Sequence, residues 1–240
     1  MISKEQELEN LKKEYAECLY AISHDLSAPL NHIREFINIF VEDMPEDFPF
    51  TELQTKSLEI IQRSSALTEE MVKAVLLLSR LNADQPHTTM SLELPFTKAI
   101  NDVFSLEDDI QSTLKLPTEW PLIEGDADQL YLMFKHVLDN AKKFQPESQK
   151  PSIEVNFSQT PTHWQCDVLD NGIGIPMEYA EDAFKVFRQL NRPHEYAGVG
   201  IGLALTHKVM TFHGGAAEFT QQDIGSCLRL SFQQPHKVSQ

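Results

Sequence analysis

The chain has 240 residues, of which 41% are hydrophobic and 23% are charged. That composition is typical of a soluble globular protein with room for one large domain or two modest ones. The formal net charge of −16 argues against a nucleic-acid-binding surface. No apolar run approaches the roughly 20 residues of a membrane-spanning helix, and the first residues lack the layout of a signal peptide.

The cysteines Cys18, Cys166 and Cys227 are far apart and form no CxxC pair. They are typical of small core residues in a reducing compartment, not of a disulfide framework or a metal site. We therefore expect a cytoplasmic protein that neither inserts directly into a membrane nor binds nucleic acid.

The first predicted element is a long amphipathic helix over residues 3–41, interrupted by Pro29, which should kink it. One face of this helix follows alternating spacings of three and four, the pattern of a helix–helix seam. The seam positions are Leu8, Leu11, Tyr15, Cys18, Ile22, Asp25 and Pro29.

His24 lies two positions past Ile22 and is expected to point away from the seam, towards water. A neutral imidazole has a nitrogen lone pair, which makes His24 a candidate nucleophile. Asp25 is close enough to fix its tautomer and polarise the other ring nitrogen. Taken alone, such a pair is more often an ordinary surface histidine.

A breaker over residues 42–50 precedes a second predicted helix over residues 51–82. Its apolar residues recur every seven positions, at Leu53, Ile60, Leu67, Ala74 and Leu81. Because one hairpin cannot bury both apolar stripes, we expect a homodimer in which two hairpins form a four-helix bundle.

After a linker at residues 83–87, short alternating strands and helices predict an α+β domain with a mixed sheet and helices on one face. We place the domains at 1–85 and 86–240. The expected helices cover 95–106, 126–143 and 201–212, and the expected strands cover 88–93, 111–116, 122–123, 152–158, 163–169, 217–220 and 227–232.

Three motifs in the second domain are candidates for binding a nucleotide. Asn140, late in a helix, offers an amide oxygen suited to Mg²⁺, and Lys143 lies one turn further on the same face. Asp170 follows a strand and offers an acceptor for the amine of adenine, while Gly172 and Gly174 let a ligand approach the main chain.

The third motif, Gly198-x-Gly200-x-Gly202, opens a helix whose bare amides suit a triphosphate. Between the second and third motifs, a polar segment containing Phe184 and Phe187 is expected to form a mobile lid. Each motif taken alone is of limited specificity.

Together, the His24 motif, the Asn140 motif, Asp170-x-Gly172-x-Gly174, the Phe184/Phe187 segment and the glycine run resemble the core of a bacterial two-component sensor histidine kinase. The segment from Phe187 to Tyr196 is most similar to the phytochrome-like branch. The resemblance implies a dimerisation and phosphotransfer hairpin followed by an ATP-binding domain of the Bergerat type.

On that resemblance, His24 attacks the γ-phosphate of Mg-ATP, with Asp25 as general base or orienting residue, and the phosphoryl group passes to a response regulator receiver domain. An upstream sensor domain or a sensor partner would supply the signal. ATP would be bound by Asn140, which also ligates Mg²⁺, and by Lys143, Asp170, Gly172, Gly174, Ile175, Phe187, Arg188, Gly198, Gly200, Gly202 and Leu203.

Several positions depart from the family pattern. Ala28 stands four residues after His24, where many relatives carry Thr or Asn, which puts phosphatase activity in doubt. Ser27, His136, Val199 and Arg188 also differ from the usual residues or positions. Together these departures leave weak or conditional kinase activity open. Two alternatives remain: a phosphotransfer or scaffold protein with weak or no kinase activity, and another ATPase of the same nucleotide fold, which the fold alone does not exclude.

Overall fold

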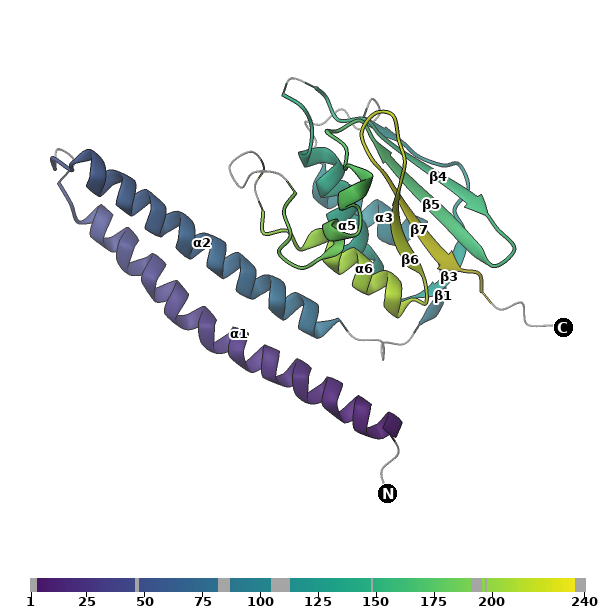
Figure 1. The fold of residues 1–240 in the computed structure, drawn as a ribbon, viewed down its shortest axis with the longest axis horizontal. Coiled ribbons are helices and arrows are strands. Elements are labelled where there is room, and N and C mark those ends of the chain that lie inside the picture. Colours follow the sequence, from purple (N-terminus) through teal and green to yellow (C-terminus); the bar gives the residue numbers. More distant parts are fainter. Residues whose placement is uncertain are drawn as a thin grey trace. The chain divides into compact units, whose positions relative to one another are not determined.

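The computed structural model describes residues 4–45, 48–81, 87–104, 113–147, 149–190, 196 and 198–235. The chain divides into two compact units, Met1–Arg80 and Leu81–Gln240 (Figure 1). Most of the predicted linker, the predicted strand residues 111–112 and the side chain of Leu8 lie outside the described residues.

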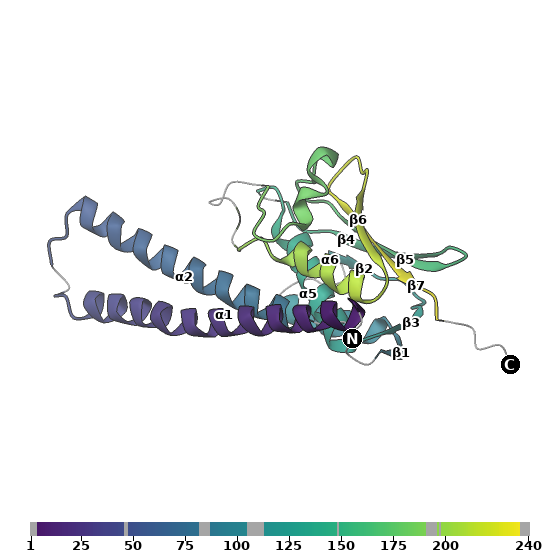
Figure 2. The same cartoon turned by 60° about the horizontal axis from the view of Figure 1, so that its bottom comes forward.

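The first unit is an antiparallel hairpin of α1 (Lys4–Glu42) and α2 (Glu52–Arg80), as Figures 1 and 2 show. Both helices were predicted, with ends that differ by one or two residues. α1 continues through Pro29. No described helix combines the length and the apolar composition that a membrane crossing requires.

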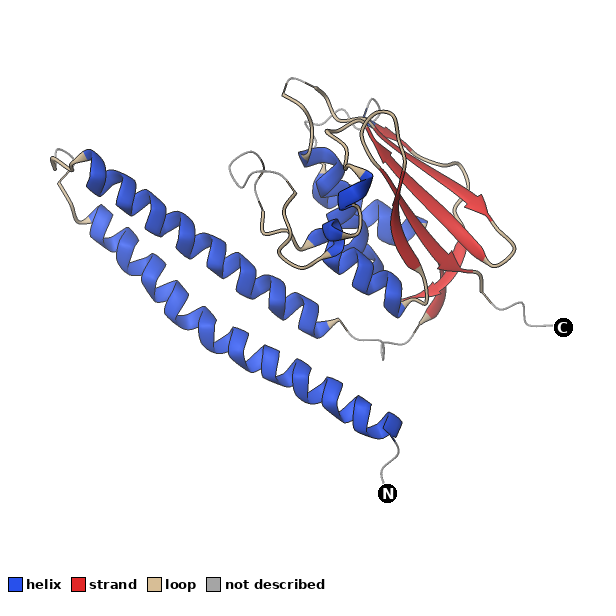
Figure 3. Ribbon diagram, in the orientation of Figure 1, coloured by secondary structure: helices blue, strands red, loops and turns tan. Residues whose placement is uncertain are grey.

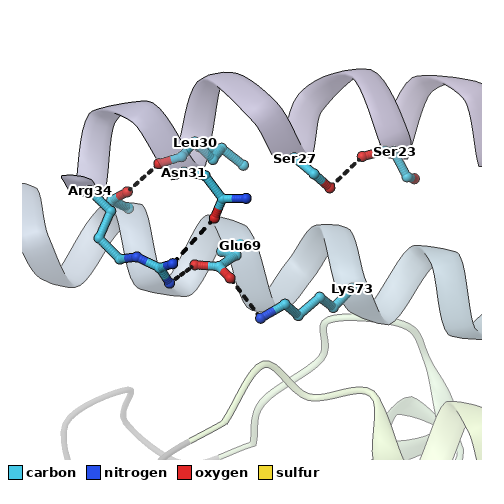
Figure 4. Close-up of polar contacts among 8 residues, drawn as sticks. Ser23, Ser27, Leu30, Asn31, Arg34, Glu69 and Lys73 are labelled. Atoms are coloured by element: carbon cyan, nitrogen blue, oxygen red, sulfur yellow. Dashed lines mark hydrogen bonds and ion pairs between the residues drawn. The ribbon is translucent and has the colours of Figure 1, made fainter. Parts of the chain in front are cut away.

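A polar cluster joins the two helices inside the hairpin (Figure 4). Glu69 of α2 is 9% exposed and accepts a hydrogen bond from Arg34 of α1. Its other carboxylate oxygen lies 2.6 Å from Nζ of Lys73. The hydrogen bond from Lys73, together with Arg34, holds the pKa of Glu69 below its usual range. Because Glu69 is almost fully buried, this pairing favours one register of α1 against α2.

Several predicted seam residues remain exposed in the hairpin. Tyr15 and Ile22 of α1 are 67% and 51% exposed, and Leu53 and Ile60 of α2 are 75% and 56% exposed. Large apolar side chains exposed at this many seam positions are uncommon on a protein that acts as a monomer. The hairpin alone therefore leaves an apolar face uncovered.

The second unit is built on a five-stranded mixed sheet with the order β2-β4-β5-β7-β6. β2 and β4 pair in parallel, and the other neighbours are antiparallel. Its strands are β2 (Leu114–Lys115), β4 (Ile153–Gln159), β5 (His163–Asp170), β6 (Ala216–Thr220) and β7 (Cys227–Gln233). A separate antiparallel pair is formed by β1 (Thr88–Ser91) and β3 (Leu122–Gly125).

Helices α3 (Glu93–Val103), α5 (Ala127–Lys143) and α6 (Gly202–Phe212) lie on one face of this sheet (Figure 3). This confirms the predicted α+β architecture. Successive side chains of β5 and β7 point to opposite faces of the sheet, so every second side chain points towards the helices. Fully buried core residues include Phe96, Phe134, Leu138, Leu205, Leu230 and Phe232.

His213, directly after α6, connects that helix to the start of α5. Its Nε2 accepts a hydrogen bond from the backbone N–H of Asp126 at 3.0 Å, so the ring proton must be on Nδ1. Nδ1 then donates to the carbonyl of Val209 at 2.7 Å. Burial lowers the pKa of His213, and the ring of His87 stacks on it at 4.7 Å. Asp126 also caps α5 by accepting from the N–H of Gln129, as predicted.

Acidification should destabilise the second unit through His213. Since folding lowers the pKa of His213, its contribution is fully present above the unfolded pKa of about 6.5 and is lost as the pH falls below that value. We expect the free energy of unfolding, followed by the fluorescence of Trp120 and Trp164, to fall by about 1 kcal/mol between pH values of roughly 7.5 and 5.5.

The variant His213→Gln should lose most of this pH dependence, because its amide does not titrate. His207→Gln is the matched control, since His207 is exposed on the same helix. A wild-type pH dependence in His213→Gln would contradict the assignment.

Candidate functional site

α1 holds His24 at the surface of the hairpin, as predicted, with its side chain 73% exposed. The Nδ1 atom of His24 lies 3.3 Å from a carboxylate oxygen of Asp25. This contact favours the tautomer with the proton on Nδ1, which leaves the lone pair of Nε2 free. In the described hairpin, no group is hydrogen-bonded to Nε2.

The polar face of α5 carries His136, Asn140 and Lys143, all half-buried. The ammonium of Lys143 lies 4.2 Å from the centroid of the Phe144 ring, and no described carboxylate is within ion-pair distance of it. Burial lowers the pKa of Lys143, with Asp139 acting in the opposite direction. A half-buried cation without a carboxylate partner is suited to an anionic ligand.

The glycine run meets this face of α5. Gly202 opens α6, and a Cβ atom at this position would lie 3.3 Å from Nδ2 of Asn140 and 3.3 Å from Cβ of His136. A Cβ atom on Gly198 would lie 3.3 Å from Nζ of Lys143. Both glycines therefore pack closely against this face of α5, and a side chain at either position would crowd Asn140, His136 or Lys143 next to the first amides of α6.

Asp170, the last residue of β5, has a carboxylate fixed by three donors. One oxygen accepts from the backbone N–H groups of Gly172 at 2.8 Å and Ser226 at 3.2 Å. The other accepts from the hydroxyl of Ser226 at 2.5 Å. A Cβ on Gly172 would lie 2.3 Å from the carbonyl oxygen of Phe144, at the end of α5. This loop therefore lies directly against the helix that carries Asn140 and Lys143.

Gly174 adopts a φ of +73°, and a Cβ there would lie 2.7 Å from the carbonyl oxygen of Gly225. Ile175 follows and is half-buried. The contribution of Gly225 and Ser226 was missed from the sequence. The available signal was the Gly-Ser turn just before β7, which is the natural neighbour of the end of β5 in the sheet.

The segment between the two glycine motifs contains the short helices η1 (Met177–Tyr179) and η2 (Asp182–Phe184). Phe187 has a φ of +61° and donates its N–H to the carbonyl of Gly200 at 2.9 Å. A Cβ on Gly200 would lie 2.7 Å from the carbonyl oxygen of Arg188. Residues 191–195 and 197, part of the predicted lid, lie outside the described residues.

Two more contacts of this segment were not anticipated. The guanidinium of Arg188 forms an ion pair with Asp182 at 3.2 Å, and the side chain of Gln189 donates to the carbonyl of Gly198. The ring of Phe184 packs 5.4 Å from that of Phe219 in β6. The segment is therefore tied both to the glycine run and to the edge strand.

This geometry defines a class of protein. The second unit is an α+β nucleotide-binding unit in which an amide, an ammonium, a carboxylate and a glycine-bearing helix start converge, and it is joined to a helical hairpin with an exposed histidine. Amide oxygens and bare backbone amides suit a metal-bound polyphosphate.

Comparison with known families agrees with this class. Residues 15–84 match the His Kinase A (phospho-acceptor) domain, and residues 125–236 match the Histidine kinase-, DNA gyrase B-, and HSP90-like ATPase family. The first range contains His24, and the second contains every residue of the converging motifs. Residues 15–84 and 125–236 therefore carry the two domains of a two-component sensor histidine kinase catalytic core.

Curated relatives include Cyanobacterial phytochrome A of Nostoc sp., 28% identical over 214 residues, which cover 87% of this chain and 27% of the relative. Sensor histidine kinase WalK of Bacillus subtilis is 24% identical over 240 residues, which cover 98% of this chain and 39% of the relative. The chain thus spans well under half the length of these relatives. The presence of phytochromes agrees with the expected resemblance.

Two solved structures share the fold. Histidine kinase ThkA, in complex with the response regulator protein TrrA, has a TM-score of 0.60 at 18% identity and matches 98% of this chain and 67% of ThkA. Full-length ShkA, in complex with AMPPNP, has a TM-score of 0.59 at 19% identity and matches 91% of this chain and 45% of ShkA.

Replacing Asp170 by Asn should destabilise the second unit. The amide group would place a donor where the carboxylate now accepts from Gly172 and Ser226. We expect the free energy of unfolding in urea to fall by about 1–3 kcal/mol. Asp128→Asn is the control, since Asp128 is 87% exposed and has only a 3.4 Å ion pair with Lys98. Equal effects of both substitutions would show that the Asp170 network adds nothing.

Proposed function

We propose that this chain is the catalytic core of an ATP-dependent protein histidine kinase. It transfers a phosphoryl group from Mg-ATP to His24 and then to an aspartate of a response regulator receiver domain. The observation that carries the proposal is the free Nε2 of the exposed His24, in a chain whose second unit brings Asn140, Lys143 and the glycine run together. Residues 1–85 act as the dimerisation and phosphotransfer domain and residues 86–240 as the ATP-binding domain.

The phosphate chain of ATP fits the space beside α5. Lys143 and the first amides of α6, from Gly202 and Leu203, contact phosphate oxygens. The side-chain oxygen of Asn140 holds Mg²⁺, which when bound neutralises charge on those oxygens. The placement is supported by the close approach of Gly198 to Lys143 and of Gly202 to Asn140, which brings the first amides of α6 beside both side chains.

The adenine base fits beside Asp170. A carboxylate can accept about four hydrogen bonds, and Gly172 and Ser226 supply three donors. The remaining acceptor position suits the exocyclic amine of adenine. Gly174 and Ile175 provide close main-chain approach and an apolar contact, whereas Phe187, Arg188 and Gly200 form the segment that covers the nucleotide.

The transfer chemistry follows from the tautomer of His24. The Nε2 lone pair attacks the γ-phosphorus, an N–P bond forms, and the P–O bond to ADP breaks. Asp25 holds the Nδ1 proton and stabilises the positive charge that develops on the ring. In the second step, a carboxylate of the receiver domain attacks the same phosphorus, the N–P bond breaks, and the imidazole regains its lone pair.

The apolar face of the hairpin supports a homodimer. Tyr15, Ile22, Leu53 and Ile60 are each more than half exposed in one chain, and a second hairpin would cover them. Because the chain covers 27% of the phytochrome relative and 39% of WalK, we propose that an upstream sensor domain or a sensor partner supplies the signal, in the cytoplasm.

A second candidate function is phosphotransfer with weak intrinsic kinase activity. It is favoured by Arg188, whose guanidinium is paired with Asp182 and so is not free for phosphate. In this case too His24 is the phosphorylated residue, but the phosphoryl group comes from a phosphorylated receiver domain instead of ATP.

The deciding experiment measures acid-labile, base-stable label on the protein after incubation with labelled Mg-ATP. We expect label on the wild type and on His32→Ala, a control at another exposed histidine of α1. We expect none on His24→Ala and at least about tenfold less on Asn140→Ala, because transition-state charge would lose its metal. Label that persists on His24→Ala would contradict the assigned acceptor. An unlabelled wild type that accepts phosphate from a receiver domain would favour the second candidate.

A further inference from the structure

Tyr20 links the candidate acceptor to the end of the other helix. It lies one turn before His24 on α1, and the two rings stack with centroids 6.4 Å apart at an interplanar angle of 25°. The guanidinium carbon of Arg80, the last residue of α2, lies 5.7 Å from the centroid of the same Tyr20 ring. One aromatic ring therefore contacts both the imidazole of α1 and a cation of α2.

Arg80 differs from Arg34 and Lys73, the basic residues of the polar cluster that joins the two helices, because it has no ion pair with a described carboxylate. Arg34 and Lys73 are both paired with Glu69. Arg80 is exposed, and among the described residues no carboxylate lies within ion-pair distance of it. Its guanidinium lies over the face of Tyr20, the ring that also stacks on His24. Within the described part of the hairpin, Arg80 is therefore a cation without a carboxylate partner that shares an aromatic neighbour with His24.

A phosphoryl group on His24 would be stabilised by a nearby positive charge. Phosphorylation of Nε2 places up to two negative charges on a ring whose Nδ1 side already faces the carboxylate of Asp25. The planar guanidinium of arginine presents several donors that match phosphate oxygens, and an exposed arginine side chain has the freedom to reach them.

We propose that Arg80, positioned by Tyr20, binds the phosphoryl group carried by His24. This subsite deepens the proposed function and rests on phosphorylation at His24. Arg80 forms and breaks no covalent bond: it donates hydrogen bonds to phosphoryl oxygens and offsets their charge. Tyr20 acts through its ring, because among the described residues none forms a hydrogen bond with its hydroxyl.

The test separates this subsite from kinase activity by loading the phosphoryl group chemically. Phosphoramidate transfers its phosphoryl group to an imidazole nitrogen with release of ammonia, so ATP is not needed. The full-length protein is loaded, and the ³¹P resonance that is missing in His24→Ala is followed as a function of pH. The pH midpoint of its shift reports the electrostatic environment of the phosphoryl group.

A nearby cation favours the more negative form and lowers this midpoint. We expect Arg80→Gln to raise it by about 0.8 pH units, the effect in water of one charge at a hydrogen-bonded separation of roughly 4 Å. Arg80→Lys should restore most of the wild-type value. Arg63→Gln should leave it unchanged, because Arg63 is an exposed arginine about 25 Å further along α2.

Tyr20 is tested by a matched pair. Tyr20→Phe keeps the ring and should keep the midpoint, whereas Tyr20→Leu should raise it towards the Arg80→Gln value. Equal midpoints in Arg80→Gln and Arg63→Gln would overturn the proposal, and so would equal midpoints in the two Tyr20 variants. A wild type that takes no label from Mg-ATP but shows the expected midpoints would refute the kinase and leave the subsite standing.

Discussion

The close approach of α6 to α5 is the constraint on which the nucleotide site depends. Gly202 lies where a Cβ would be 3.3 Å from both Asn140 and His136, so any larger residue would have to move the helix start or the polar face of α5. The amides of α6 can face a ligand only while this contact is preserved. The same packing brings Gly198 beside Lys143. The contact between α5 and the start of α6 therefore brings together the amide of Asn140, the ammonium of Lys143 and the backbone N–H groups of α6.

Asp170 extends this arrangement to the sheet. Its carboxylate joins the end of β5, the loop at Gly172 and the turn before β7, while the carbonyl of Phe144 accepts from the N–H of Ile173 at 2.9 Å. Three chain segments that are distant in sequence therefore meet at the C-terminal end of α5. These hydrogen bonds hold the Asp170 carboxylate in one orientation even without a ligand. Little side-chain entropy is therefore lost when a ligand binds to it.

The local parts of this structure could be predicted from the sequence, because their causes are local. Asp126 caps α5 through its own next turn, and the Nδ1 contact of His24 is made by its neighbour in sequence, Asp25. The sequence indicated that Gly172 and Gly174 occupy positions where glycine is required. It did not indicate why: a Cβ atom there would collide with the carbonyl oxygens of Phe144 and Gly225. Ser226 and Arg80 were missed because their roles depend on strand register and on helix pairing, which bring together segments that are distant in sequence.

The two units place positive charge near a phosphate group in different ways. A chain with a net charge of −16 repels phosphate at long range, so any anion site must be built from local groups. The second unit uses the half-buried Lys143 and helix amides, which act at short range in a poorly solvated place. The hairpin has an exposed acceptor, where water screens every charge, and burial of His24 would block access to its Nε2. Arg80, whose guanidinium lies over the Tyr20 ring and has no carboxylate partner among the described residues, is a flexible cation of the kind that such an open position can use.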